Sequence, residues 1–252
     1  MSFFLDAFAF ILDPANWAGD VGIGARLARH LALTGVSVLL AAVVAVPLGL
    51  LIGHTGRGRA AVIGITGAAR ALPTFGVLIL FVLLGIQFGQ GLSEGPVIAV
   101  LVILAIPPLL AGAYAGVEAV DDVTVDAARA QGMTEWQLLT RVELPLALPL
   151  LAGGLRSATL QVVATATIAA YVAQGGLGRY LIEGIQTRDY VRAVIGAILV
   201  ALLALLLDGI LAVVQRLVTP RGVSRGATRT TGTTARRPSR SSGATRAPVT
   251  EG

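Results

Sequence analysis

Long stretches without a charged side chain constrain this chain more than any other feature. Residues 31–52 contain no Asp, Glu or Arg, and neither do residues 95–117. A helix that crosses a bilayer needs about 20 consecutive, mostly apolar residues. The composition agrees, because 55% of the residues are hydrophobic and 13% are charged, against about 25% charged residues in a typical soluble domain. The sequence therefore predicts an all-α, polytopic membrane protein.

Three further segments bring the number of predicted transmembrane spans to about five. Residues 62–88 are apolar but contain Arg70 and Pro73, so we expect one interrupted helix with its break near residues 72–74. Residues 144–171 carry one charged side chain, that of Arg156. Residues 191–214, which carry Arg192 and Asp208, form the last predicted span. Residues 31–216 then make up the transmembrane domain.

The basic character of the chain is concentrated at its C-terminal end. All 19 basic residues are Arg, and seven of them lie in residues 217–252 against the single acid Glu251, which gives this tail a charge of +6. Its Arg, Ser, Thr, Gly and Pro content predicts a disordered basic tail that contacts anionic lipid. Basic and aromatic residues are not interleaved as they are in nucleic-acid-binding surfaces, so we expect no nucleic acid partner.

Missing residue types exclude several kinds of chemistry. The chain has no Cys, which excludes disulfides, thiolate metal sites and thiol nucleophiles, and its two His residues are too few for a His-rich metal site. It has no Lys, so a GxxxxGK[ST] phosphate-binding loop cannot occur. The HExxH motif of zinc proteases is absent as well. We therefore expect a non-catalytic subunit without a cofactor or metal, and any ATP and magnesium would be bound by a partner chain.

The distribution of Arg in the short loops predicts the orientation. With the tail in the cytoplasm, the loop that contains Arg57 and Arg59 and the loop of residues 118–145 also face inward, as the positive-inside rule favours. Arg residues 26, 29, 179 and 188 do not follow this rule. Residues 1–30 are predicted to be an interfacial segment, because their apolar beginning lacks the basic region of a signal peptide.

A cluster of glycines suggests irregular structure on the outer side. Gly175, Gly176 and Gly178 follow the fourth predicted span and would break a helix. This segment is either an ordinary turn or irregular backbone that lines a cavity.

The longest polar interruption, residues 118–145, still has the pattern of folded structure. Residues 123–131 favour a helix, and Gly132 suits a left-handed stop just beyond it. Thr134 and Gln137 form a capping-box pattern at the start of a second helix, whose apolar residues Trp136, Leu139 and Val142 are spaced three apart. The sequence therefore predicts two short helices that meet at Gly132, the second of which ends at Pro145. They would either dock a soluble partner or rest on the lipid headgroups.

The spacing within this stretch resembles the EAA loop of bacterial ABC importer permeases, EAA-x3-G-x9-I-x-LP. The matching residues are Asp126-Ala127-Ala128, Gly132 and Leu144-Pro145, with Asp in place of Glu at 126 and Val in place of Ile at 142. Segments 71–75, 131–137, 142–149, 164–171 and 175–178 further resemble the osmoprotectant branch, which imports glycine betaine, choline, carnitine or proline betaine. The resemblance covers residues 31–215. It departs from that branch where an Arg-Asn-Thr-Tyr stretch is replaced by residues 111–114.

The resemblance implies a type I ABC importer permease fold in the bacterial plasma (inner) membrane. It also implies three partners: an ABC ATPase subunit that grips the cytoplasmic hairpin, a second permease subunit, and an extracytoplasmic substrate-binding protein. ATP binding would then switch the permease from inward- to outward-facing. The residues expected to couple the chain to the ATPase are Asp126, Ala127, Ala128, Gly132, Met133, Thr134, Trp136, Leu139, Leu144 and Pro145.

Polar residues within the predicted spans are candidates for more than one role. Tyr114 and Tyr171 are expected to line the translocation path, whereas Thr159 and Thr165 either line it or mediate helix–helix contacts. Arg156 and Asp208 form an intramembrane charge pair, or Arg156 extends to the headgroups.

Two alternatives to osmoprotectant import are kept. One is a related permease for methionine or another amino acid. The other is an ATPase-independent channel or ion-coupled carrier.

Overall fold

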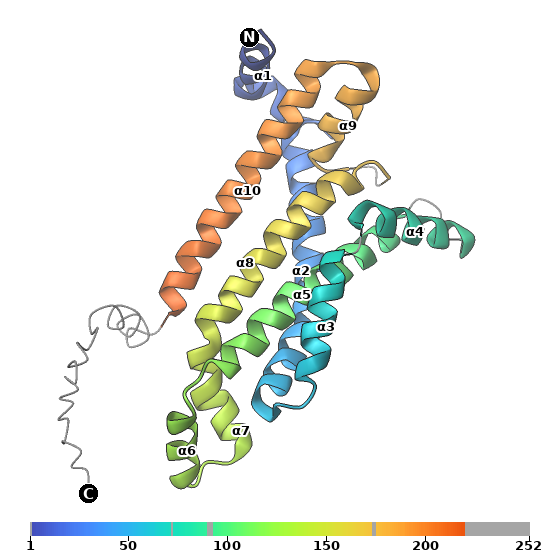
Figure 1. Cartoon of the computed structure of the whole chain (residues 1–252). Coiled ribbons are helices and arrows are strands. Elements are labelled where there is room, and N and C mark those ends of the chain that lie inside the picture. Colours follow the sequence, from blue (N-terminus) through green and yellow to red (C-terminus); the bar gives the residue numbers. More distant parts are fainter. Residues whose placement is uncertain (1, 72, 90–92, 173–174, 220–252) are drawn as a thin grey trace, which may run out of the picture. The chain divides into compact units, whose positions relative to one another are not determined.

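The computed structural model describes residues 2–71, 73–89, 93–172 and 175–219, and every regular element within them is helical (Figure 1). The elements are α1 (Ser2–Leu12), the 3-10 turn η1 (Pro14–Trp17), α2 (Ile23–Thr55), α3 (Arg59–Ala71), α4 (Thr74–Gln87), α5 (Glu94–Glu118), α6 (Asp122–Ala130), α7 (Glu135–Leu138), the π-helical turn η2 (Leu139–Glu143), α8 (Leu144–Ala169), α9 (Gly178–Thr187) and α10 (Tyr190–Val218). The all-α prediction is confirmed. Most of the predicted tail, from residue 220 onward, lies outside the described residues.

Four helical segments are long and apolar enough to cross a membrane: Ile23–Thr55, Glu94–Glu118, Glu135–Ala169 and Tyr190–Val218. They contain or closely match the predicted spans 31–52, 95–117, 144–171 and 191–214. The first begins eight residues earlier than predicted, inside the segment of residues 1–30 that we expected to be interfacial.

The remaining predicted span, residues 62–88, is not one helix. It consists of α3 and α4, which have 13 and 14 residues and are each too short to cross a bilayer alone. The break falls where it was predicted, because Pro73 adopts an extended conformation (φ −70°, ψ 104°) and starts α4 as its N-cap. Proline lacks the N–H that would continue α3. Figure 1 shows α3 running along the long helices and α4 lying across them.

Small residues let α2, α5 and α8 pack with their backbones close together. A Cβ on Gly112 of α5 would lie 2.8 Å from the Cα of Gly154 in α8, and one on Gly49 of α2 would lie 2.8 Å from the carbonyl oxygen of Leu110. Close approach of this kind is the usual way in which membrane helices associate. It fixes α8, which carries most of the candidate site, against the centre of the bundle.

The glycine-rich segment after α8 packs back onto the same bundle. A Cβ on Gly178 would overlap the carbonyl oxygen of Thr167, and Gly176 (φ +80°) lies against the buried His30 of α2. These contacts favour the ordinary-turn interpretation for residues 175–178. Residues 173–174 lie outside the described part of the chain.

Candidate coupling hairpin and translocation face

The interspan hairpin, residues 118–145, begins with a helix that is capped at both ends. Asp121 accepts a hydrogen bond from the backbone N–H of Val123 at the N-terminus of α6. At the other end Gly132 has φ +81°, its N–H donates to the carbonyl of Arg129 (2.9 Å), and the N–H of Met133 donates to the carbonyl of Ala128 (3.3 Å). These two bonds define a Schellman motif, so the predicted left-handed stop at Gly132 is confirmed.

The second helix of the hairpin starts with the predicted capping box. Gln137 N–H donates to Thr134 Oγ1 (3.3 Å), and Thr134 N–H donates to Gln137 Oε1 (3.0 Å). The prediction that this helix ends at Pro145 is wrong, because α7 continues through the π-helical turn η2 into α8 as one helical segment, Glu135–Ala169. Leu144 N–H bonds to the carbonyl of Leu139 in this wider turn. The wider turn immediately precedes Pro145, whose ring would crowd a regular α-helical turn.

A small apolar core holds the two helices of the hairpin together. Val125 and Ala128 of α6 pack against Leu138, whose side chain has no exposed surface, and Met133 and Val142 pack at the edge of this cluster. Sequence analysis missed Leu138, because the three-residue spacing drew attention to its neighbours. The same spacing grouped Val142 with Trp136, whereas in the structure Val142 packs against the hairpin core and Trp136 is exposed.

One salt bridge spans the turn between the two helices. Arg129 donates from Nε to Glu135 Oε1 (3.1 Å) and from Nη2 to Glu135 Oε2 (3.2 Å), a bidentate geometry. The hydrogen bonds from Arg129 lower the pKa of the Glu135 carboxyl below its ordinary value of 4.5. Both side chains are about half exposed, so solvent screens the pair and its effect on stability is small.

A histidine of the first long helix connects the hairpin to the bundle. His54, near the C-terminus of α2, places Nδ1 2.7 Å from Glu143 Oε2 and Nε2 3.2 Å from Glu135 Oε2. Glu143 is 4% exposed, so its carboxylate needs such a partner. Sequence analysis missed this cluster, whose members lie up to 89 residues apart.

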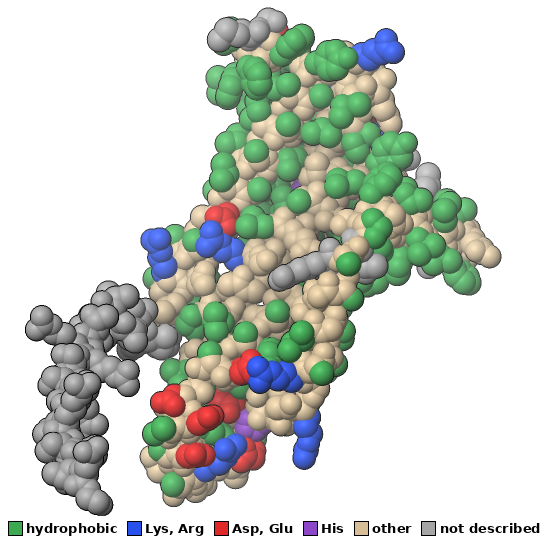
Figure 2. All heavy atoms as spheres, viewed as in Figure 1, with side chains coloured by type: hydrophobic (Ala, Val, Ile, Leu, Met, Phe, Trp, Pro, Cys, Tyr) green, Lys and Arg blue, Asp and Glu red, His purple; other side chains and the backbone are tan. Residues whose placement is uncertain are grey.

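The predicted coupling residues divide into an outward and an inward group. Asp126, Ala127, Gly132, Thr134 and Trp136 are exposed, and Trp136 is 73% exposed although it is large and aromatic. Ala128 is buried in the hairpin core, and the remaining four are half-buried: Met133, Leu139, Leu144 and Pro145. In Figure 2 the charged side chains gather at this end of the molecule, whereas the face above it is mostly hydrophobic.

The structure brings Arg156 of α8 and Asp208 of α10 together. Arg156 Nε donates to Asp208 Oδ1 (2.5 Å) and Nη2 donates to Oδ2 (2.6 Å). Gln215 adds a second polar contact between the same helices, because its Nε2 donates to the carbonyl of Pro149 (2.8 Å). The bidentate pair therefore fastens α10 to α8 within the membrane-spanning part of the chain.

The four predicted path residues do not share one surface. Tyr114, Thr159 and Thr165 are each at most 8% exposed, and the Thr159 hydroxyl donates to the carbonyl of Leu155 in its own helix (2.8 Å). Because Thr159 and Thr165 are buried, the helix–helix interpretation is favoured for these two residues, and Tyr114 is buried as well. Tyr171 is 54% exposed and meets Phe75 of α4 edge-to-face, with ring centroids 6.1 Å apart. Tyr171 is therefore the residue of these four that remains a candidate for the translocation path, because its side chain is exposed and the other three are buried.

Within the described part of the chain, one face of α8, continued by Tyr171 just beyond its C-terminus, is largely exposed. Its exposed members follow helical spacing and mix polar with apolar side chains: Leu150, Ser157, Gln161, Ala164, Ile168 and Tyr171. Between residues 191 and 215 the exposed side chains on α10 are by contrast uniformly apolar, among them Leu202, Leu205, Leu206 and Ile210. Polar side chains in membrane helices normally face protein or water-filled space rather than lipid. The α8 face is therefore the better candidate for a translocation surface.

The chain combines long apolar helices with a capped polar hairpin between two of them. The helix that follows the hairpin has a face of mixed polarity. This arrangement is that of a membrane transport subunit. Residues 45–220 match the family model described as binding-protein-dependent transport system inner membrane component. The chain belongs to this family.

Several characterised relatives are similar over most of the chain. The glycine betaine/carnitine/choline transport system permease protein OpuCB of Bacillus subtilis is 33% identical over 198 residues, which cover 79% of this chain and 89% of the relative. The choline transport system permease protein OpuBB of the same organism is 32% identical, over 78% and 88%. The osmoprotectant import permease protein OsmW of Salmonella typhimurium is 30% identical, over 87% and 100%.

Solved structures share the fold. The inward-facing methionine ABC transporter MetNI has a TM-score of 0.67 at 22% identity, over 77% of this chain and 97% of that one. An amino acid ABC transporter solved with histidines has a TM-score of 0.61 at 22% identity, over 76% and 92%. Since both identities are below 25%, this likeness concerns the fold alone, which is that of type I ABC importer permeases.

Proposed function

We propose that this chain is the permease subunit of an ATP-driven importer of osmoprotectants such as glycine betaine, choline and carnitine. The observation that carries this proposal is the match to permeases of that description at 30–33% identity over most of both chains. The methionine alternative has only a likeness of fold behind it. Membership of a binding-protein-dependent transport family argues against a channel or carrier that works without an ATPase.

The interspan hairpin is the proposed docking element for the ATPase subunit, which would bind ATP and magnesium. Both of its helices are capped, its core is apolar, and Trp136 projects from it with no partner in the described residues. An exposed Trp on a rigid polar hairpin is typical of a protein contact, because aromatic anchors fill pockets at low entropic cost. The hairpin and the C-terminal tail would then face the cytoplasm.

The experiment is ligand-stimulated ATP hydrolysis by the permease reconstituted with its ATPase and candidate binding proteins. We expect stimulation by a quaternary amine and loss of ATPase copurification in Trp136→Ala. Phe4→Ala is the matched control, because it removes a 59% exposed aromatic ring from α1, at the end of the molecule opposite the hairpin. The ATPase should copurify normally with this variant. Stimulation by methionine alone, or substrate flux without any ATPase, would overturn the proposal.

The mixed face of α8 is the proposed contribution of this chain to the translocation path, together with the Phe75–Tyr171 pair. Quaternary ammonium groups are attracted to aromatic faces, so two exposed rings at the end of this face suit that cargo. A second permease subunit would complete the path and cover the rest of the face.

Because the chain has no Cys, single cysteines can test the path directly. Gln161→Cys and Ile168→Cys should react with a charged, membrane-impermeant thiol reagent, and substrate should slow the reaction. Leu206→Cys, exposed on the apolar face of α10, is the control and should stay unreactive because lipid covers it. Equal labelling at Leu206 and Gln161 would refute the assignment of the α8 face.

A further inference from the structure

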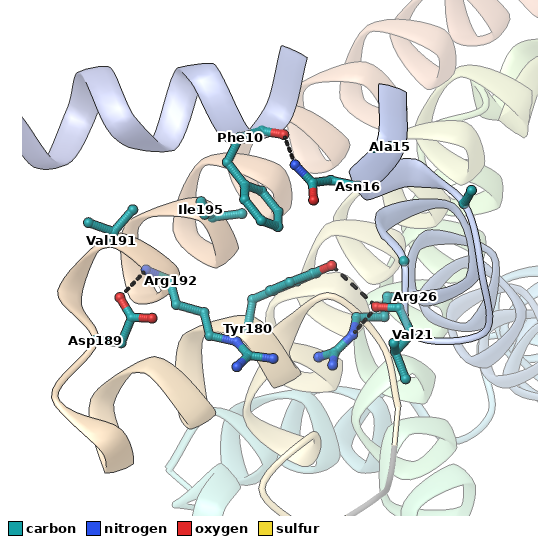
Figure 3. A pocket seen from close by; sticks show the side chains of 12 residues that line it. Phe10, Ala15, Asn16, Val21, Arg26, Tyr180, Asp189, Val191, Arg192 and Ile195 are labelled. Carbon is teal, nitrogen blue, oxygen red and sulfur yellow. Dashed lines mark hydrogen bonds between the residues drawn. The ribbon is translucent and has the colours of Figure 1, made fainter. Parts of the chain in front are cut away.

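A cavity of about 460 Å³ lies at the end of the molecule opposite the hairpin, and neither the coupling nor the transport proposal uses it. It is enclosed by α1, η1, α2, α9 and α10 (Figure 3). Its apolar walls include Phe10, Val191 and Ile195, and its polar walls come from Asn16, Arg26, Tyr180, Asp189 and Arg192. Two guanidinium groups and a group of apolar side chains thus share one space.

The two arginines lie beside the same aromatic ring. The guanidinium carbon of Arg26 is 4.3 Å from the centroid of the Tyr180 ring, and that of Arg192 is 5.8 Å from it. Figure 3 shows both guanidinium groups next to the Tyr180 side chain, reaching it from different helices. The ring holds the two cations close to each other, which raises the local positive potential.

Acidic side chains do not balance this charge. Glu183 is the carboxylate shared by Arg26 (3.6 Å), Arg179 (2.5 Å) and Arg192 (2.7 Å). Asp189 also lines the cavity, where it accepts a hydrogen bond from the backbone N–H of Arg192 as the N-cap of α10. Three guanidinium groups against two carboxylates leave a net charge of +1 in the cluster. That is the charge which a single anionic group would neutralise.

One buried guanidinium nitrogen at the cavity also lacks a hydrogen-bond partner among the residues that the structure describes. The side chain of Arg26 is 11% exposed, and its Nη1 has no acceptor within the described part of the chain. The neutral donors are already used, because Tyr180 Oη donates to the carbonyl of Val21 (3.4 Å) and Asn16 Nδ2 donates to the carbonyl of Phe10 (3.0 Å). Arg26 Nη1 therefore lacks an acceptor, and an oxyanion bound in the cavity would supply one.

We propose that this cavity binds the phosphodiester group of an anionic phospholipid. A phosphodiester carries one negative charge and presents oxygens that match guanidinium donors. The apolar walls suit the glycerol and the first methylenes of a lipid, and α1 next to them exposes Phe3, Phe4 and Phe8. Basic pockets between membrane helices bind anionic headgroups on the cytoplasmic side, and this cavity offers the same chemistry at the other end of the molecule. The bound lipid would join α1 to α9 and α10.

The test measures lipid retained by the full-length chain, purified with its copurifying subunits and exchanged into nanodiscs. Discs of phosphatidylcholine are compared with discs that contain phosphatidylglycerol, and bound lipid is counted by native mass spectrometry after release. We expect one tightly retained phosphatidylglycerol per chain and a higher melting temperature in the anionic discs. Arg192→Gln, at a side chain that is 40% exposed, should weaken this retention about tenfold.

Arg29→Gln is the matched control, because Arg29 is on the same end of α2 as Arg26 but pairs with Glu94 outside the cavity. It removes the same charge and should leave retention within about twofold, since exposed charges away from the site are screened. Equal loss in both variants, or no preference for phosphatidylglycerol in the unmodified chain, would overturn the proposal. So would stabilisation of the chain in phosphatidylcholine discs by inorganic phosphate alone, which would indicate a site for the free anion.

Discussion

Gly132 allows the rigidity of the interspan hairpin to be tested with little steric interference. Its φ is +81°, and no atom lies within 4 Å of the position that a Cβ would take, so a substitution changes the backbone preference rather than the packing. An L-residue in this left-handed conformation costs about 1–2 kcal/mol, and Asn costs less. Proline fixes φ near −65° and also removes the N–H that bonds to Arg129, so Gly132→Pro should cost about 3 kcal/mol or more.

These free energies predict a graded loss of coupling. A cost of 1–2 kcal/mol lowers the ratio of ordered to disordered hairpin about 5- to 30-fold, and the proline cost lowers it more than about a hundredfold. Substrate-stimulated ATP hydrolysis and uptake by the reconstituted importer should therefore fall in the order Gly132→Asn, Gly132→Ala, Gly132→Pro. Membrane insertion should be unchanged in all three, because the long apolar helices do not include this residue.

The control separates backbone strain from coupling. Gly19, in the turn before α2, has φ +83° and equally open surroundings, but it lies at the other end of the chain. Gly19→Ala should cost the same strain and leave stimulated ATP hydrolysis intact. Normal coupled uptake by Gly132→Pro, or equal loss of coupling in Gly19→Ala, would refute the idea that the hairpin acts as a rigid lever.

Three further perturbations address the charges. Arg156→Asp and Asp208→Arg should each lower the melting temperature of the purified permease, and the double variant should restore it; failure of the rescue would count against a structural pair. Because the pKa of Glu135 is lowered in the folded chain, its pair with Arg129 stabilises the hairpin above about pH 4.5, and this contribution is lost as the pH falls through the lowered value. The melting temperatures of the unmodified chain and Glu135→Gln should thus differ at pH 7 and converge in acid; a difference that persists there would show another cause. Truncation after residue 219 should leave reconstituted uptake unchanged, and a marked loss would assign the tail a role in transport.

Features that depend on a few neighbouring residues were predictable from the sequence. The left-handed Gly132 and the capping box of Thr134 and Gln137 follow from local backbone chemistry, and the structure has both. Apolar length fixed four of the spans, because each helix must satisfy its own backbone within the bilayer. The break at Pro73 was equally local, although the sequence did not indicate that the two halves would become separate helices in different directions.

Contacts between distant segments were not predictable, because no periodicity within one segment specifies its partner. His54 and Glu143 are 89 residues apart, and nothing in the spacing of either pairs them. The exposed aromatic pair of Phe75 and Tyr171 likewise depends on how α4 lies against α8. The charge pair of Arg156 and Asp208 was a partial exception, since two opposite charges at similar depth in apolar helices have few other partners.

The continuity of α7 with α8 joins the two proposed activities in one element. Glu135–Ala169 has 35 residues and is therefore about 52 Å long at 1.5 Å per residue. Trp136 lies one residue from its N-terminus, Gln161 lies on its exposed face, and Tyr171 follows its C-terminus. A separate hairpin would have to pass its movement through a flexible joint, whereas a continuous helix carries a tilt along its length. The fixed points are the close contact of Gly112 with Gly154 and the tether of His54 to Glu143. We therefore expect motion imposed at Trp136 to reorient the α8 face directly, and disruption of the His54 tether to weaken coupling without changing the exposure of that face.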